Sequence, residues 1–153
     1  MNTAPKKQVA ISFLGTVLDK GFNQERWLKW RPNVAMNQRQ DFHLDRMELF
    51  YAEKYRELAD HVKADIQQVS PHTDVNLVPM ELENPWDFSE VYTKLHDWAA
   101  GYAFDTEEET YLTHITTGTH VAQICLFLLV ESRQIPGVLL QTAPPKNQRR
   151  NMG

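Results

Sequence analysis

The fold is decided by the stretch YLTHITTGTHVAQICLFLLV, residues 111–130. It opens with a short strand-like run and passes through a turn of threonines around Gly118. It then becomes an apolar segment too long for an ordinary strand, which predicts a helix. A strand, a glycine turn and a helix in this order form half of a βαβ unit, in which ligands bind at the carboxyl ends of the strands.

The turn at 116–120 has a composition that suits an anion. The first amides of a helix have no acceptors within the helix, and the helix dipole favours negative charge there. The hydroxyls of Thr116, Thr117 and Thr119 add donors beside Gly118. The turn therefore predicts a site for phosphate or another anion. The alternative is a threonine that only caps the helix, but the turn holds more threonines than one cap requires.

Length and charge limit the classes of function. A chain of 153 residues with a formal net charge of −4 predicts one domain with a single core. The acidic balance argues against a broad surface for long nucleic acid, although local groups can still hold a small anion. The single cysteine, Cys125, is expected to be a core residue, and one cysteine cannot form an internal disulfide, which favours the cytoplasm. No signal peptide is recognisable and residues 121–130 are too short to span a bilayer, so no membrane partner is expected.

A second glycine–threonine turn follows the first strand. Residues 9–14 are almost entirely apolar, as in a strand buried on both faces of a parallel sheet. The run ends at Gly15 and Thr16 and continues through Val17 and Leu18 to Asp19. An ordinary exit from a strand is the alternative here. The glycine pattern of a dinucleotide site is absent, and neither a cofactor nor a metal is predicted.

Residues 26–36 interleave two tryptophans with the basic side chains of Arg26, Lys29 and Arg31. Such a segment can stack on a base and pair with phosphate. The alternative is that the tryptophans pack on the sheet while the basic side chains lie in solvent.

The other segments alternate between strands and helices. Strands are expected at 46–51, 74–82 and 138–142 and helices at 55–69 and 87–102. Charged residues of the first helix, among them Asp60, Lys63 and Asp65, are expected to form a solvated face. At the second helix Asp87 and Glu90 match a capping box, with Trp86 packing onto Val91.

This alternation predicts an α/β fold: a Rossmann-like, doubly wound, mostly parallel sheet of five to six strands flanked by helices. Right-handed crossovers and a switch point give the strand order 3-2-1-4-5. The first and fourth strands are then neighbours, so the turns at 15–19 and 116–120 converge on one crevice.

Four segments together resemble a known family: FLGTVLD at 13–19, WLKWRP at 27–32, NPWDF at 84–88 and HITTGTH at 114–120. They are similar to the CARF (CRISPR-associated Rossmann fold) sensor domains, in particular those of sigma-54-dependent transcriptional activators of bacterial RNA-repair operons. The resemblance extends to Pro145. It implies a ligand-sensing domain at 1–143, followed at 144–153 by a linker or tail toward an AAA+ module.

The resemblance also implies that the loops after the first and fourth strands form the pocket. The residues expected to bind ligand are Gly15, Thr16, Val17, Leu18, Asp19, Arg31, Thr116, Thr117, Gly118, Thr119 and His120. Amides near Gly118 would hold phosphate, the threonines would donate to phosphate or ribose oxygens, and His120 would contact phosphate. Asp19 would accept from a ribose hydroxyl or an adenine amino group, or would order its own loop.

The predicted function is therefore regulatory and not enzymatic. The ligand would be an RNA end, such as one with a 2′,3′-cyclic phosphate, or a cyclic oligoadenylate. The alternative is a metal-independent ring nuclease, with His120 as the weak catalytic candidate and His114 as a core residue. Because only Gln123 is polar between Val121 and Val130, the helix at 120–132 is expected to pair with a second copy in a homodimer.

Overall fold

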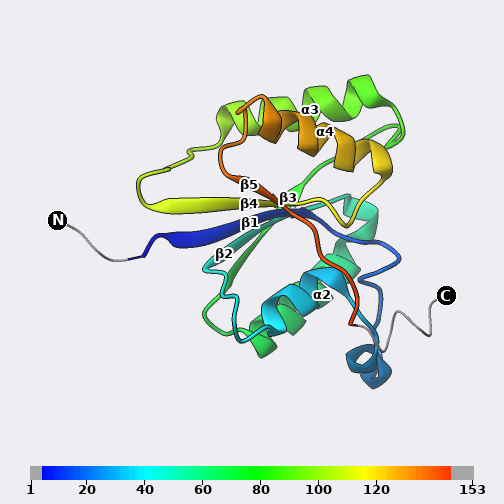
Figure 1. Ribbon diagram of the computed structural model, residues 1–153. Helices are drawn as coiled ribbons and strands as arrows, with labels where there is room; N and C mark the ends of the chain where they lie inside the picture. The colour runs from blue at the N-terminus through cyan, green and yellow to red at the C-terminus, as the bar shows by residue number, and fades with distance from the viewer. Residues whose placement is uncertain (1–4, 146–153) are drawn as a thin grey trace.

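The computed structural model describes residues 5–145 as helical layers on both faces of one sheet (Figure 1). The strands are β1 (Lys7–Phe13), β2 (Arg46–Tyr51), β3 (Asp74–Pro79), β4 (Glu109–His114) and β5 (Val138–Leu140). Their order is β3-β2-β1-β4-β5, and every neighbouring pair is parallel. The predicted Rossmann-like α/β fold and the order 3-2-1-4-5 are thus confirmed. Most of the predicted linker or tail at 144–153 lies outside the described residues.

The helices divide between the two faces of the sheet. They are α1 (Pro32–Ala35), α2 (Arg56–Val69), α3 (Phe88–Gly101) and α4 (His120–Glu131), with single 3-10 turns at η1 (Gln24–Leu28), η2 (Met36–Gln38) and η3 (Glu53–Tyr55). In Figure 1, α3 and α4 lie side by side on one face and α2 covers the other. None of the helices in residues 5–145 has the length and hydropathy to cross a membrane.

Alternation along the strands produces two cores, one on each face of the sheet, so the predicted single core is wrong. On β1, Val9 and Ile11 pack in the core beneath α3 and α4, whereas Ala10 packs in the core over α2. All three side chains are fully buried, as expected for a central strand with helices on both faces.

Two strands end earlier than their apolar patterns suggest. The strand expected at 74–82 ends at Pro79, and the strand expected at 138–142 ends at Leu140. Proline has no N–H group for the ladder, so pairing stops there. After Leu140 the chain leaves the sheet and instead forms hydrogen bonds with the loop after β4 through Thr142.

The predicted capping box at the start of α3 is wrong. The Asp87 side chain makes no capping hydrogen bond. The Glu90 carboxylate accepts hydrogen bonds from the backbone N–H groups of Glu83 and Asn84, at 2.7 and 2.9 Å. Trp86 remains 61% exposed while Val91 is fully buried, so the expected packing between them does not form. The carboxylate binds amides of the preceding loop because that loop folds back over the first turn of the helix.

Candidate ligand-binding site

A cavity of about 520 Å³ lies at the carboxyl edge of the sheet, within the size range of small-molecule sites. The loops after β1, β2, β3 and β4 all line it. From the first and last of these loops come Gly15, Thr16, Val17, Leu18, Thr116, Thr117, Gly118, Thr119 and His120. The two glycine turns therefore converge on one crevice, as the strand order predicts. Asp19 and Arg31 do not line this cavity.

Asp19 holds the β1 loop from inside the protein. Its carboxylate accepts hydrogen bonds from the Gly15 N–H at 2.6 Å, from the Asn33 side-chain amide at 2.6 Å and from the Asn33 N–H at 3.0 Å. Burial raises the pKa of Asp19, and these hydrogen bonds oppose that shift. Of the roles predicted for Asp19, the geometry corresponds to ordering its own loop.

Gly15 leaves room for this carboxylate. A Cβ at Gly15 would lie 2.9 Å from an Asp19 oxygen and 3.0 Å from the Thr117 methyl group. On the solvent side, the Lys29 ammonium donates to the carbonyls of Val17 and Lys20, at 2.9 and 2.8 Å. The loop is thus fixed from both sides.

The threonine hydroxyls of the β4 loop are already hydrogen-bonded within the protein. Thr117 donates to the Phe13 carbonyl at 2.6 Å. Thr119 accepts from the Ala122 N–H at 3.1 Å, which caps α4, and donates to the Pro85 carbonyl at 3.0 Å. Thr116 accepts from the Thr142 N–H at 2.9 Å. These hydroxyls therefore fix the loop, and donation to a ligand would require the rearrangement of existing bonds.

Backbone amides of both loops remain available as donors. Within residues 5–145, no hydrogen bond to protein occupies the N–H groups of residues 16–18 or 117–121. Gly118 has a φ of +90°, and a Cβ there would lie 3.1 Å from the Phe13 Cβ. Glycine adopts this conformation without strain. Successive free amides at a loop and a helix start are the usual anion-binding groups of proteins.

His114 connects the end of β1 to the segment that follows β5. Its Nδ1 lies 2.9 Å from the Ser12 hydroxyl, and its Nε2 lies 2.8 Å from the Thr142 hydroxyl. Ser12 also donates to the Asn33 side-chain oxygen at 2.7 Å. Burial lowers the pKa of His114 to about 4, so the ring is neutral at pH 7. His114 is a core residue with both ring nitrogens bonded, as the sequence predicts.

Two lining residues that were not predicted come from the loops after β2 and β3. Lys54 lies in η3 with its ammonium 5.3 Å from the centre of the Tyr55 ring. It forms no ion pair with any carboxylate in the described residues. Trp86 precedes α3. The topology offered a signal for both, because every parallel strand of the sheet ends at the same edge.

Arg31 is buried away from the cavity. Its guanidinium is 2% exposed and binds Asp65 of α2 at 2.8 Å, beside a second bond from Arg26 to the same carboxylate. The guanidinium carbons of Arg26 and Arg31 lie over the Trp27 ring, at 5.0 and 5.1 Å from its centre. Burial tends to raise the pKa of Asp65, but the bonds from both arginines lower it overall. The expectation of a solvated Asp65 is wrong because Arg31 folds onto α2. The alternative in which Arg31 lies in solvent is wrong for the same reason, and in this structure Arg31 does not reach the cavity in which it is predicted to bind ligand.

Comparison with known proteins identifies relatives of the chain. The family model for RtcR, the regulator of RNA terminal phosphate cyclase, matches residues 6–153. The transcriptional regulatory protein RtcR of Escherichia coli (strain K12) is 51% identical over 149 residues, which are 97% of this chain and 28% of that protein. The chain thus spans less than a third of that relative. Among solved structures, Enterococcus italicus Csm6 bound to cyclic hexa-2′-fluoro-hexa-dAMP matches with a TM-score of 0.69 and 16% identity, over 93% of this chain and 35% of that one. This last likeness shows a shared fold.

The buried His114 makes stability depend on pH. In the unfolded chain the imidazole takes up a proton below its ordinary pKa of about 6.5, whereas the folded protein resists protonation down to about 4. Stability is therefore retained above pH 6.5 and falls by about 3 kcal/mol as the pH drops toward 4. We expect His114→Gln to lower the free energy of unfolding at pH 7.5 and to flatten this decline. Urea unfolding at a series of pH values measures the free energy of unfolding, and His43→Gln, at an exposed position, is the control. If stability depends on pH equally in both variants, the buried His114 is not the cause of the decline.

Arg31→Ala is expected to impair folding, because it removes one of two cations from a buried carboxylate. The free energy of unfolding should fall by about 2–3 kcal/mol. Arg39→Ala, which breaks a solvent-exposed pair with Asp41, should leave the free energy of unfolding almost unchanged. Chemical denaturation of both variants and the wild type measures these free energies of unfolding. If Arg31→Ala weakens ligand binding at unchanged stability, Arg31 contacts the ligand.

Proposed function

Because the chain belongs to the RtcR family, we propose that it is the cytoplasmic ligand-sensing domain of a sigma-54-dependent transcriptional regulator of RNA repair. Its ligand is an RNA-derived phosphate compound: an RNA end with a 2′,3′-cyclic phosphate, or a small cyclic oligoadenylate. Binding in the cavity relieves the inhibition of an AAA+ module that follows the domain.

The observation that carries this proposal is the pair of glycine loops lining one cavity with unoccupied amides. Residues 16–18 and 117–120 line the cavity from two sides, and their N–H groups have no acceptor in the described protein. Lys54 adds a positive charge without a carboxylate partner in the described residues. Donors and a cation around a small cavity favour phosphate over a neutral ligand. The net charge of −4 restricts this attraction to the cavity, so the ligand is small.

The hydrogen bonds of Thr142, which follows β5, support a route from the bound ligand to the segment after this strand. Thr116 lines the cavity and binds the Thr142 backbone, while Thr142 also bonds to His114. Thr142 immediately precedes Ala143 and the prolines at 144–145. A ligand that moves the β4 loop therefore acts directly on the start of the segment that leads out of the domain. Population of one of two loop arrangements would set the state of the downstream module.

Isothermal titration with matched RNAs tests the proposal. The probes are a short RNA ending in a 2′,3′-cyclic phosphate, the same RNA ending in hydroxyls, and cyclic hexaadenylate. The domain should bind at least one phosphate ligand and discriminate against the hydroxyl end. Absence of binding by all probes contradicts the proposal. Chromatography of the ligands after incubation separates sensing from ring-nuclease activity, since shorter products that vanish with His120→Ala would make the domain an enzyme.

Lys54→Gln should weaken binding of the phosphate probe by about tenfold, because it removes one phosphate contact. It should also reduce the slope of log affinity against log salt by about one. Lys63→Gln on the surface of α2 provides the control and should change neither quantity. An unaltered salt slope in Lys54→Gln would exclude Lys54 from phosphate binding.

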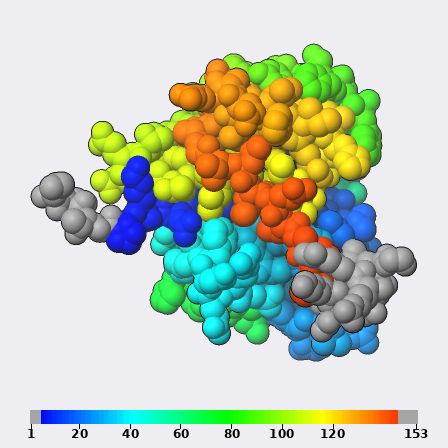
Figure 2. Space-filling model, viewed as in Figure 1, coloured from blue at the N-terminus to red at the C-terminus, as the bar shows by residue number. Residues whose placement is uncertain are grey.

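We further propose that the domain forms a homodimer through the helix predicted at 120–132. On α4, the outward side chains of Ile124, Phe127 and Leu128 are 53%, 44% and 38% exposed. Figure 2 shows this helix at the surface of the upper layer. Apolar side chains grouped on one helix favour burial against another surface. The CARF resemblance favours a second copy of the chain.

Phe127→Asp should convert the dimer to a monomer, because a charge at the interface loses its hydration on association. Phe22→Asp is the control, since Phe22 is equally exposed at 46% but lies on His61 of α2. Light scattering coupled to gel filtration measures the mass. A monomeric wild-type domain at high concentration, with and without ligand, contradicts the dimer.

A further inference from the structure

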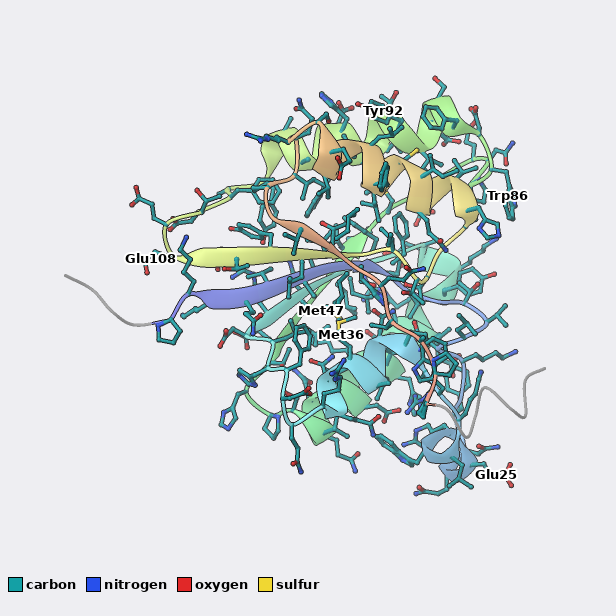
Figure 3. The ribbon with its side chains drawn as sticks, in the orientation of Figure 1. Glu25, Met36, Met47, Trp86, Tyr92 and Glu108 are labelled. Atoms are coloured by element: carbon teal, nitrogen blue, oxygen red, sulfur yellow. The ribbon has the colours of Figure 1, made fainter. Side chains whose placement is uncertain are left out.

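Trp86 is a large aromatic side chain that the protein leaves exposed at the cavity. It lines the cavity and is 61% exposed. In the described residues its ring takes part in no aromatic or cation–π pair, in contrast to Trp98, which packs on Phe50 at 4.8 Å. Figure 3 shows Trp86 beside the start of α4, where the β4 loop enters the helix. Exposure of an indole at the rim of a cavity is a feature of binding sites.

The backbone that carries Trp86 is held in place. The Trp86 N–H donates to the Asn84 side-chain oxygen at 3.0 Å. The Glu90 carboxylate holds the N–H groups of Glu83 and Asn84. The Pro85 carbonyl accepts from the Thr119 hydroxyl at 3.0 Å. The backbone next to Trp86 is therefore hydrogen-bonded to the β4 loop, whose amides hold the phosphate in the proposed function, so binding has little backbone left to order.

The charges that line the cavity favour one orientation for an anionic ligand. The loop after β3 contributes Glu83, whose carboxylate disfavours phosphate at this wall. The glycine loops after β1 and β4 offer amide donors, and the wall from the β2 loop offers Lys54 and Tyr55. This arrangement favours a ligand whose phosphate lies toward the glycine loops and whose aromatic part lies toward Trp86.

We propose that Trp86 forms a nucleobase subsite and stacks on the base that adjoins the bound phosphate. The inference rests on the proposed function and adds to it the requirement for a base: the domain recognises a nucleotide and not a phosphate alone. Stacking on an aromatic side chain tolerates every base, because each base has a π face. The subsite therefore selects for nucleotide ligands without fixing their sequence.

Titration of two matched small ligands tests the subsite. The probes are adenosine 2′,3′-cyclic phosphate and 1,4-anhydroribitol 2,3-cyclic phosphate, which has the same ring and phosphate without a base. The wild-type domain should bind the adenosine compound about tenfold more tightly. Trp86→Ala should reduce this preference to about twofold or less and leave the affinity for the base-free compound unchanged, whereas Trp86→Phe should retain part of it.

Phe88→Ala is the matched control. Phe88 is an exposed ring at the start of α3, the helix that follows Trp86, and it does not line the cavity. It should keep the full preference. Indole fluorescence provides a second readout, since quenching by the adenosine probe should disappear in Trp86→Phe. If the wild type binds both probes equally, or Trp86→Ala keeps the preference, the subsite is refuted while the phosphate site stands. If the wild type binds neither probe, the proposed function fails together with the subsite.

Discussion

The carboxylate of Asp19 lies in the interior of the domain and accepts hydrogen bonds from Gly15 and Asn33. A buried carboxylate without such donors costs several kcal/mol, so the loop around it is held in one arrangement. The Asn33 side-chain oxygen accepts a hydrogen bond from the Ser12 hydroxyl, and this hydroxyl is also hydrogen-bonded to His114 at the end of β4. The two glycine loops are therefore positioned by one continuous set of buried hydrogen bonds, and the cavity between them depends on it.

The same bonds explain why the cavity is formed before a ligand arrives. Each threonine of the β4 loop is bonded to a different neighbour: Thr116 to Thr142, Thr117 to Phe13 and Thr119 to Pro85. Their hydroxyls fix the loop, whereas the backbone N–H groups of residues 117–121 have no acceptor in the described protein. A loop that is ordered in advance loses little entropy on binding. One of these neighbours, Thr142, follows β5, so the β4 loop of the site is hydrogen-bonded directly to the segment after that strand.

The fold could be predicted from local patterns, since apolar runs at 9–14 and 111–130 specify a central strand and a strand–turn–helix unit, and topology then brings their ends together. The roles of side chains that depend on partners distant in the sequence could not be predicted from these local patterns. The burial of Arg31 follows from its pairing with Asp65, more than thirty residues away. The Glu90 carboxylate accepts hydrogen bonds from N–H groups of the preceding loop and not from the N–H groups at the start of its own helix. Lys54 lies in no recognised motif, and the segment NPWDF at 84–88 does not by itself show that Trp86 lines the cavity. The shared edge of the parallel strands brings both residues to the site.

Hydrogen–deuterium exchange with and without a short RNA ending in a 2′,3′-cyclic phosphate can show whether amides of both glycine loops bind the phosphate of one ligand. Exchange should slow at residues 16–18 and 117–121 together, because these N–H groups have no protein acceptor in the described structure, and should change near Thr142. The outer face of α2 should be unaffected. Protection confined to one loop, or found only outside the cavity, would contradict binding of one phosphate by both loops.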